Sequence, residues 1–197
     1  MNRPTLDIIA VTYGQVEILK CFINSIKSQT NPNWRLLLVH DGVNEELRLD
    51  LEKNGYLGDN VIFIEYPERT MNYGHILRKW SLENLVTGDY VLITNGDNYY
   101  TPNMVDEVLS KNVDLIYFDC VHSHDNIKNH NKSSYGYMNC LLSISNIDMG
   151  CVVVKSNIAK SVGFNHTGYA ADWNYFSEIL ETNPSILKIN KILFVHN

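Results

Sequence analysis

Charged residues are scarce in this chain, and long hydrophobic runs are absent. Asp, Glu, Lys and Arg make up 19% of the 197 residues against a hydrophobic fraction of 45%, which excludes a disordered chain. The net charge of −6 argues against a protein that grips nucleic-acid phosphates. No apolar run reaches the roughly 18 residues of a membrane span, and the N-terminal residues lack the apolar core of a signal peptide.

Cysteine is also rare, and the glycine motifs of two large nucleotide-binding classes are missing. The four cysteines form no Cys-x-x-Cys pair, which is typical of reduced, buried thiols, and we therefore expect a cytoplasmic protein. No Gly-x-Gly-x-x-Gly follows the first predicted strand, and no P-loop occurs anywhere. The length predicts one domain over residues 1–197.

Short β-branched runs alternate with segments of helical period through the first half of the chain. The predicted strands there are Leu6–Thr12, Arg35–His40, Val61–Glu65 and Tyr90–Thr94. This alternation predicts an α/β fold with a mostly parallel central sheet and helices on both faces. The second half is less regular, with strands predicted over residues 113–119, 149–154 and 192–195 and a long polar loop over residues 122–137.

Polar side chains follow three of the predicted strands. The three strand ends are Thr12-Tyr13-Gly14, His40-Asp41-Gly42 and Asn95-Gly96-Asp97. Ligands of parallel α/β sheets bind beyond the carboxyl ends of the strands, so these segments are candidate binding residues. Asn, Gly and Asp are also ordinary turn formers, and a plain turn is the alternative for Asp41-Gly42 and for Asn95-Gly96-Asp97.

Four further residues have a chemical and a structural interpretation each. Asp97 could hold a hard divalent cation or simply close a turn. His196 could complete a metal site as a neutral imidazole or be an ordinary exposed residue. Asp172 begins a predicted helix, where it would favour the helix dipole and could also act as a general base. Arg78 could contact an anionic ligand or be a solvated charge.

Three histidines fall in or at the start of the polar loop. His122, His124 and His130 are separated by Asp and Asn, and no cysteine joins them at ligand spacing. We therefore do not predict a zinc site in this loop.

Four stretches of sequence stand in an informative order. They are IIAVTYGQVEILKCFINSIKSQT, LLLVHDGVNEEL, VLITNGDNYYTPNMVDEVL and GYAADWNYFSEIL. Together they resemble the first strand and helix, the second strand, the Asp-x-Asp region and the base-bearing helix of family 2 glycosyltransferases. The resemblance implies the GT-A fold of nucleotide-diphospho-sugar transferases, with residues 1–99 as the nucleotide-sugar half and residues 100–197 as the acceptor half.

The resemblance also implies a role for each candidate residue. Asp172 would be the catalytic base, and Asp97 with His196 would hold Mn²⁺ or Mg²⁺. The remaining candidates would bind the donor: Thr12, Tyr13, Asp41, Gly42, Arg78, Asn95 and Gly96. One departure concerns the metal, because Asn95 stands where the family usually has an acidic residue.

The predicted function is metal-dependent transfer of a sugar from a nucleotide-diphosphate donor to an acceptor hydroxyl. Inversion is implied by the resemblance, and the acceptor would be a glycan or a lipid-linked or protein-linked group. A UDP-sugar is favoured because the Asp41 carboxylate can accept the N3–H of uracil. Two alternatives remain open: a nucleotide-sugar-binding module without catalysis, and a sugar-phosphate nucleotidyltransferase.

Overall fold

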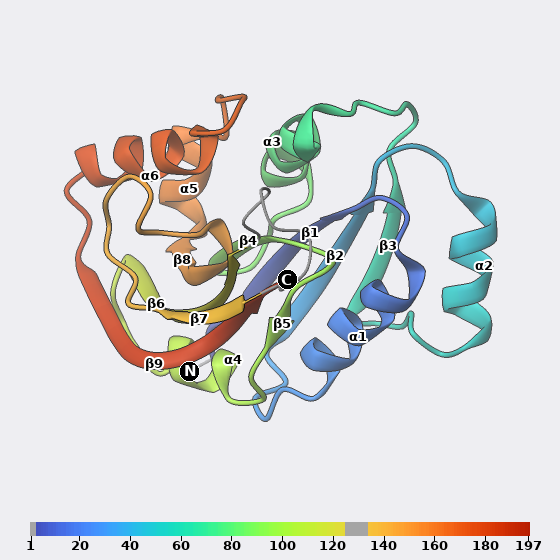
Figure 1. Ribbon diagram of the computed structural model, residues 1–197, viewed down its shortest axis with the longest axis horizontal. Helices are drawn as coiled ribbons and strands as arrows, with labels where there is room; N and C mark the ends of the chain where they lie inside the picture. Colours follow the sequence, from blue (N-terminus) through green and yellow to red (C-terminus); the bar gives the residue numbers. More distant parts are fainter. Residues whose placement is uncertain (1–2, 125–133) are drawn as a thin grey trace.

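The computed structural model describes residues 3–124 and 134–197 and contains one curled sheet (Figure 1). Its strands are β1 (Leu6–Thr12), β2 (Trp34–His40), β3 (Val61–Glu65), β4 (Tyr90–Asn95), β5 (Tyr99–Tyr100), β6 (Leu115–His124), β7 (Ser134–Met138), β8 (Val152–Lys155) and β9 (Ile186–His196). The helices are α1 (Val16–Lys27), α2 (Glu45–Lys53), α3 (His75–Asn84), α4 (Met104–Leu109), α5 (Ser156–Val162) and α6 (Ala171–Glu181), with short 3₁₀ turns η1 (Asn72–Gly74) and η2 (Met149–Cys151).

The sheet is parallel in its first half and mixed in its second. The order is β3-β2-β1-β4-β8-β6-β9-β5, with β7 added on β6. Strands β3, β2, β1 and β4 run parallel, as the alternating sequence pattern predicts. Strand β8 is antiparallel to both β4 and β6, whereas β6 and β9 pair in parallel. The carboxyl ends of β1, β2 and β4 therefore lie together at one edge.

Helices cover both faces of the parallel part of the sheet, which explains the nearly continuous apolar runs of β1, β2 and β4. Successive residues of β1 face opposite sides: Ile8 packs in the cluster with α1, α2 and α4, and Ile9 in the cluster with α3, α5 and α6. Figure 1 shows α1 and α2 at one end of the molecule and α5 and α6 at the other. No helix in the described ranges is long and apolar enough to cross a membrane.

The second half differs from the sequence prediction in three places. The segment interpreted as a polar loop from residue 122 forms the end of β6 and the start of β7, and the rest of it lies outside the described residues. The predicted strand over residues 149–154 begins as the 3₁₀ turn η2. The last strand begins at Ile186, six residues earlier than predicted, because it pairs with β6 through two register shifts around Asp119.

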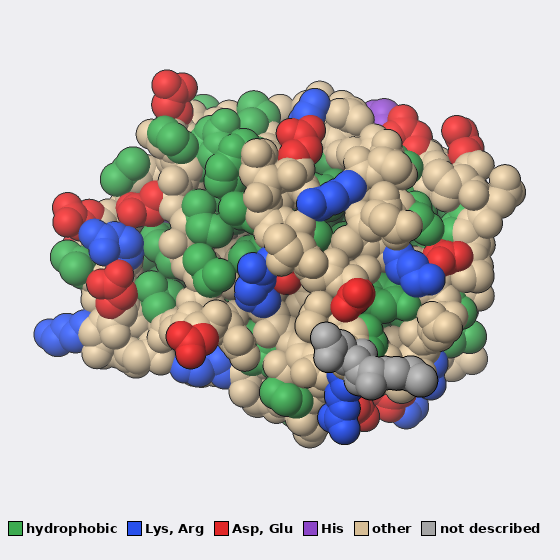
Figure 2. Space-filling view, turned by 180° about the vertical axis from the view of Figure 1, so that it is seen from behind, with side chains coloured by type: hydrophobic (Ala, Val, Ile, Leu, Met, Phe, Trp, Pro, Cys, Tyr) green, Lys and Arg blue, Asp and Glu red, His purple; other side chains and the backbone are tan. Residues whose placement is uncertain are grey.

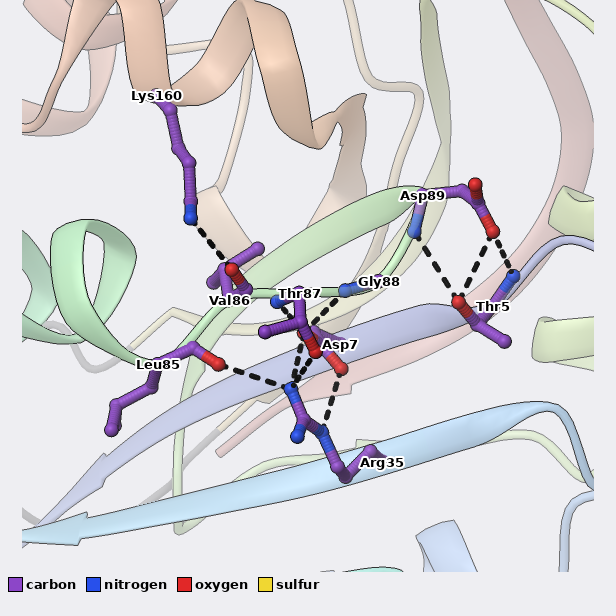
Figure 3. Close-up of polar contacts among 9 residues, drawn as sticks. All are labelled: Thr5, Asp7, Arg35, Leu85, Val86, Thr87, Gly88, Asp89 and Lys160. Atoms are coloured by element: carbon purple, nitrogen blue, oxygen red, sulfur yellow. Dashed lines mark hydrogen bonds and ion pairs between the residues drawn. The ribbon is translucent and has the colours of Figure 1, made fainter.

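A polar network joins the strands at the opposite, amino-terminal edge (Figure 3). The Asp7 carboxylate accepts hydrogen bonds from Arg35 Nε at 3.0 Å and Nη2 at 2.8 Å. The same carboxylate accepts the backbone N–H groups of Thr87 at 2.7 Å and Gly88 at 2.8 Å. Asp7 is buried, so four donors compensate the lost hydration of its charge.

Candidate active site

A pocket of about 1080 Å³ opens at the carboxyl ends of β1, β2 and β4. The structure brings all but one of the sequence-predicted residues together in its lining: Thr12, Tyr13, Asp41, Arg78, Asn95, Gly96, Asp97, Asp172 and His196. Gly42 is not in the lining; it has a φ of 96° and packs against the backbone and Cβ of Arg69. Its contribution is therefore to the turn that follows β2.

Gly96 packs the turn after β4 against β1. A Cβ atom at this position would lie 2.9 Å from Leu19 Cδ1 and 3.0 Å from Thr12 Cβ, closer than a side chain tolerates. The Gly96 N–H donates to the Val11 carbonyl at 2.9 Å. The absence of a side chain thus sets the neighbouring Asp97 beside the end of β1.

Asp41 uses both carboxylate oxygens to hold the segment after β3. Oδ1 accepts from Thr70 N at 2.6 Å and Thr70 Oγ1 at 2.9 Å, and Oδ2 accepts from Met71 N at 3.0 Å. A carboxylate offers about four acceptor sites, so these bonds leave capacity for one more donor. Asp41 therefore has a structural function here whether or not it also binds a base.

An arginine that sequence analysis did not select lies over Tyr13. The Arg69 guanidinium carbon is 3.7 Å from the centroid of the Tyr13 ring, a cation–π contact at the pocket wall. The Tyr13 ring is also 5.8 Å from that of His40, whose Nδ1 lies 2.8 Å from the Gly42 carbonyl oxygen. This wall presents a positive charge and an aromatic face to the pocket.

Arg78 is a buried cation on the pocket floor, and Asn95 is its partner. Arg78 Nη2 donates to Asn95 Oδ1 at 2.6 Å, and Nη1 donates to the Tyr73 carbonyl at 2.7 Å. Burial lowers the pKa of Arg78, and the nearby Asp172 and Asp97 carboxylates oppose that shift. The amide of Asn95, standing where the family pattern has an acid, thus serves as a neutral acceptor for this guanidinium.

Two carboxylates of the pocket are kept in surroundings that disfavour their charge. Asp172 lies in the first turn of α6, and burial raises its pKa to about 6, against an opposing effect of Arg78. Burial also raises the pKa of Asp97, while the nearby His196 and Arg78 oppose the rise. An acid with a pKa near neutrality can both accept and release a proton under ordinary conditions, which suits Asp172 to general-base work.

His196 lies in a group of metal-ligand side chains that does not include Asp97. Its Nε2 is 3.8 Å from Asp148 Oδ2, and the ligand atoms of His122, Asp148 and His196 lie within 4.8 Å of one another. Over the described ranges, Asp97 belongs to no such group. Within the described residues, the Nδ1 atom of His196 is buried and has no hydrogen-bond partner.

The rim of the pocket carries backbone in the left-handed region. Met71, Asn72 and Tyr73 have φ values of 56°, 44° and 53°, followed by Gly74 at 74°. Non-glycine residues rarely adopt this conformation, and it concentrates at functional sites. The segment holds the Tyr73 ring 83% exposed at the pocket, and Tyr169 is fully exposed on the α6 side.

Sequence analysis missed Arg69 in the pocket wall, and His122 and Asp148 beside His196, for identifiable reasons. Arg69 lies in the connection after β3, where no periodic pattern marks it. His122 was grouped with its neighbours in a loop, although its alternation with Cys120 on β6 is a strand signal. Asp148 caps η2, with Gly150 N donating to its Oδ1 at 2.8 Å, and the packing of η2 against β6 and β9 brings it to His196.

Comparison with known proteins assigns the family. The sequence profile described as glycosyl transferase family 2 matches residues 7–135, which is more than half of the chain. The chain belongs to glycosyl transferase family 2. A search of the curated proteins finds no match.

Solved structures share the fold at low sequence identity. The first 349 residues of S. aureus TarS match with a TM-score of 0.74 and 14% identity, over 98% of this chain and 60% of that one. A mannosyltransferase from Pyrobaculum calidifontis, in complex with GDP-Man and Mn²⁺, matches with a TM-score of 0.70 and 17% identity, over 100% of this chain and 57% of that one. These likenesses show the GT-A fold, and the chain spans less than two thirds of each of these structures.

Proposed function

We propose that this chain transfers a sugar from a nucleotide-diphosphate donor, with a UDP-sugar favoured, to an acceptor hydroxyl. The observation that carries the proposal is the pocket at the carboxyl edge, where a buried arginine and two carboxylates of raised pKa face one cavity. The TarS structures with UDP and UDP-GlcNAc and the mannosyltransferase with GDP-Man support a nucleotide-sugar donor by analogy of fold.

The donor would lie along the wall formed by the strand ends. Thr12, Tyr13 and Asp41 are the proposed contacts of the base and ribose, because they line the side of the pocket that Arg69 closes. Arg78 is the proposed contact of the donor's anionic part. Gly96 and Asn95 position this wall, the first by close packing and the second through Arg78.

The pocket side chains suit a divalent cation. Asp97 offers oxygen and His196 offers nitrogen, ligands that Mn²⁺ accepts. When bound, such a cation offsets charge on the departing diphosphate. Asp97 and His196 are its proposed ligands.

Asp172 is the proposed general base. A hydroxyl is a poor nucleophile at neutral pH, so its attack on the anomeric carbon benefits from a carboxylate that takes the proton. The attack forms the new carbon–oxygen bond as the bond to the diphosphate breaks, and approach from the opposite face inverts the anomeric centre. The pKa of about 6 keeps Asp172 mostly deprotonated at pH 7.

A thermal-shift screen of nucleotide sugars with and without Mn²⁺, followed by a transfer assay with the stabilising donor, tests this proposal. A ligand at about 100 times its dissociation constant stabilises a folded protein by roughly 2.7 kcal/mol. We expect UDP-sugars to give the largest shift and to release UDP when an acceptor is supplied. No shift with any nucleotide sugar would contradict the proposal.

The alternative is a binding module without catalysis. It is favoured by one observation: the residue at position 95 is a neutral asparagine, and its side-chain oxygen accepts a hydrogen bond from Arg78. The alternative predicts the same thermal shifts but neither hydrolysis nor transfer of the donor sugar.

A further inference from the structure

Two histidines and an aspartate converge where the last strand ends. His122 on β6 and His196 on β9 are direct partners in the parallel register. Their rings stack with centroids 4.1 Å apart and planes 4° apart. Asp148, in the connection before β8, reaches the same place from η2. Three segments far apart in sequence therefore present ligand atoms at one point.

The spacing of these atoms fits a shared ion better than direct hydrogen bonds. Asp148 Oδ2 is 3.9 Å from His122 Nε2 and 3.8 Å from His196 Nε2, beyond hydrogen-bond length. Two ligands held about 2.1 Å from one ion at a tetrahedral angle lie about 3.4 Å apart. An ion bound by all three groups would draw them closer and would turn one imidazole out of the stack, because the nitrogen lone pairs of two parallel rings do not converge on one point.

The Asp148 carboxylate is already oriented for this purpose. Its Oδ1 accepts the Gly150 N–H at 2.8 Å, which turns Oδ2 toward the two imidazoles. Outer hydrogen bonds of this kind fix ligand orientation in metal sites. The three side chains are only partly buried, so a cation has access to them.

The chemistry of the three groups favours a transition metal. Two imidazoles with one carboxylate form a ligand set for Mn²⁺, Co²⁺ or Zn²⁺, whereas Mg²⁺ prefers oxygen.

We propose that His122, Asp148 and His196 form a divalent transition-metal site. This proposal rests on the proposed function, because His122 and Asp148 would be two further ligands of the donor's cation, beside Asp97 and His196. Metal binding is measured without donor or acceptor, so its failure and the failure of sugar transfer are separate results.

The test is a Mn²⁺ titration of the full chain without nucleotide, followed by electron paramagnetic resonance. Mn²⁺ is the suitable probe because Cys120, Cys140 and Cys151 form a buried thiol group that would compete for softer metals such as Zn²⁺. We expect one bound Mn²⁺ with imidazole-nitrogen couplings in the wild-type spectrum.

His122→Ala and Asp148→Asn should each weaken Mn²⁺ binding at least tenfold, and His122→Ala should also remove one nitrogen coupling. The matched control is His166→Ala, which breaks another histidine–carboxylate pair, with Glu178 at 2.8 Å, and should leave the affinity unchanged. Circular dichroism establishes that each variant is folded.

Two results would overturn the proposal. One is a wild-type chain that binds no Mn²⁺ alone or binds it without nitrogen coupling, an outcome that needs no variant. The other is Asp97→Asn abolishing Mn²⁺ binding while His122→Ala and Asp148→Asn bind as the wild type does, which would place the cation on Asp97.

Discussion

The two edges of the parallel sheet differ in how fully their buried polar groups are hydrogen-bonded. At the amino edge, the Asp7 carboxylate receives hydrogen bonds from Arg35, Thr87 and Gly88 (Figure 3). At the carboxyl edge, Asp97 and Asp172 have raised pKa values because burial is not fully compensated. Arg78 Nε and His196 Nδ1 there have no hydrogen-bond partner within the described residues.

This difference is the one expected between an edge that stabilises the fold and an edge that binds a ligand. A buried polar group that lacks a partner costs stability, and a ligand that supplies the partner recovers it. On the face seen in Figure 2, Lys and Arg are interspersed with Asp and Glu. The following predictions test the contrast, from the largest expected effect to the smallest.

Removing the base at the carboxyl edge should abolish most catalysis. Asp172→Asn preserves size but cannot accept the acceptor's proton, and loss of a general base costs about 10²–10⁴-fold in rate. UDP and Mn²⁺ affinities should stay nearly unchanged. The measurements are the transfer rate and equilibrium binding; a wild-type rate would remove Asp172 from the mechanism, and lost nucleotide binding would place it in the donor site.

Removing the carboxylate at the amino edge should cost stability instead. Asp7→Ala leaves Arg35 and two backbone N–H groups without their acceptor, and breaking a buried ion pair costs about 3–5 kcal/mol. Because Arg35 is partly exposed, we expect the lower end of that range in the free energy of unfolding, measured with urea. The active-site pKa values should not move. Asp89→Ala is the matched control on the same edge; it breaks the exposed contact to Thr5 and should cost about 1 kcal/mol.

The raised pKa of Asp172 predicts opposite pH effects on activity and stability. In the proposed mechanism the deprotonated form of Asp172 is active, so kcat/KM should be half-maximal near pH 6 and fall tenfold per unit below it. The shift from 3.8 to about 6 corresponds to about 3 kcal/mol of stability that is present below pH 3.8 and is lost as the pH rises through 6. Asp172→Asn should therefore stabilise the fold at pH 7 by an amount of that order and by almost nothing at pH 4, as urea unfolding at both pH values would reveal.

A variant of Asp41 tests whether one carboxylate can both hold the segment after β3 and bind the base of the nucleotide. The Asp41 carboxylate can accept the N3–H of uracil or thymine, whereas N3 of cytosine has no proton to donate. UDP and dTDP should bind more tightly than CDP by about tenfold, the worth of one charge-assisted hydrogen bond. Asp41→Asn should erode this preference, measured by calorimetry. Equal affinities for all three nucleotides in the wild type would remove Asp41 from the base site.

The parallel half of the fold and its strand-end residues were predictable because their signals are local. Buried strands such as Leu36–Val39 read as continuous apolar runs, and the polar residues that follow them lie at the edge where parallel strands end. On this basis the sequence placed Thr12, Asp41 and Asp97 in one pocket. The register that positions them depends on repeating hydrogen bonds along the strands.

The meeting of His122, Asp148 and His196 was not predictable in the same way. It depends on the pairing of β6 with β9, which are separated by more than sixty residues and joined with register shifts at Asp119. A shift of one residue would turn His122 to the other face of the sheet. Neither the loop-like composition after Cys120 nor the short apolar run at the C-terminal strand carries that information.

The left-handed backbone at the pocket rim limits which sequences could replace this one. A side chain such as that of Tyr73 in the left-handed α conformation costs about 1–2 kcal/mol, which glycine would avoid. Tyr73→Gly should raise thermal stability and remove an aromatic ring from the mouth of the pocket. A consensus or stability-guided redesign would therefore select against this tyrosine, and a library screened for heat resistance alone would lose the aromatic lining of the pocket mouth.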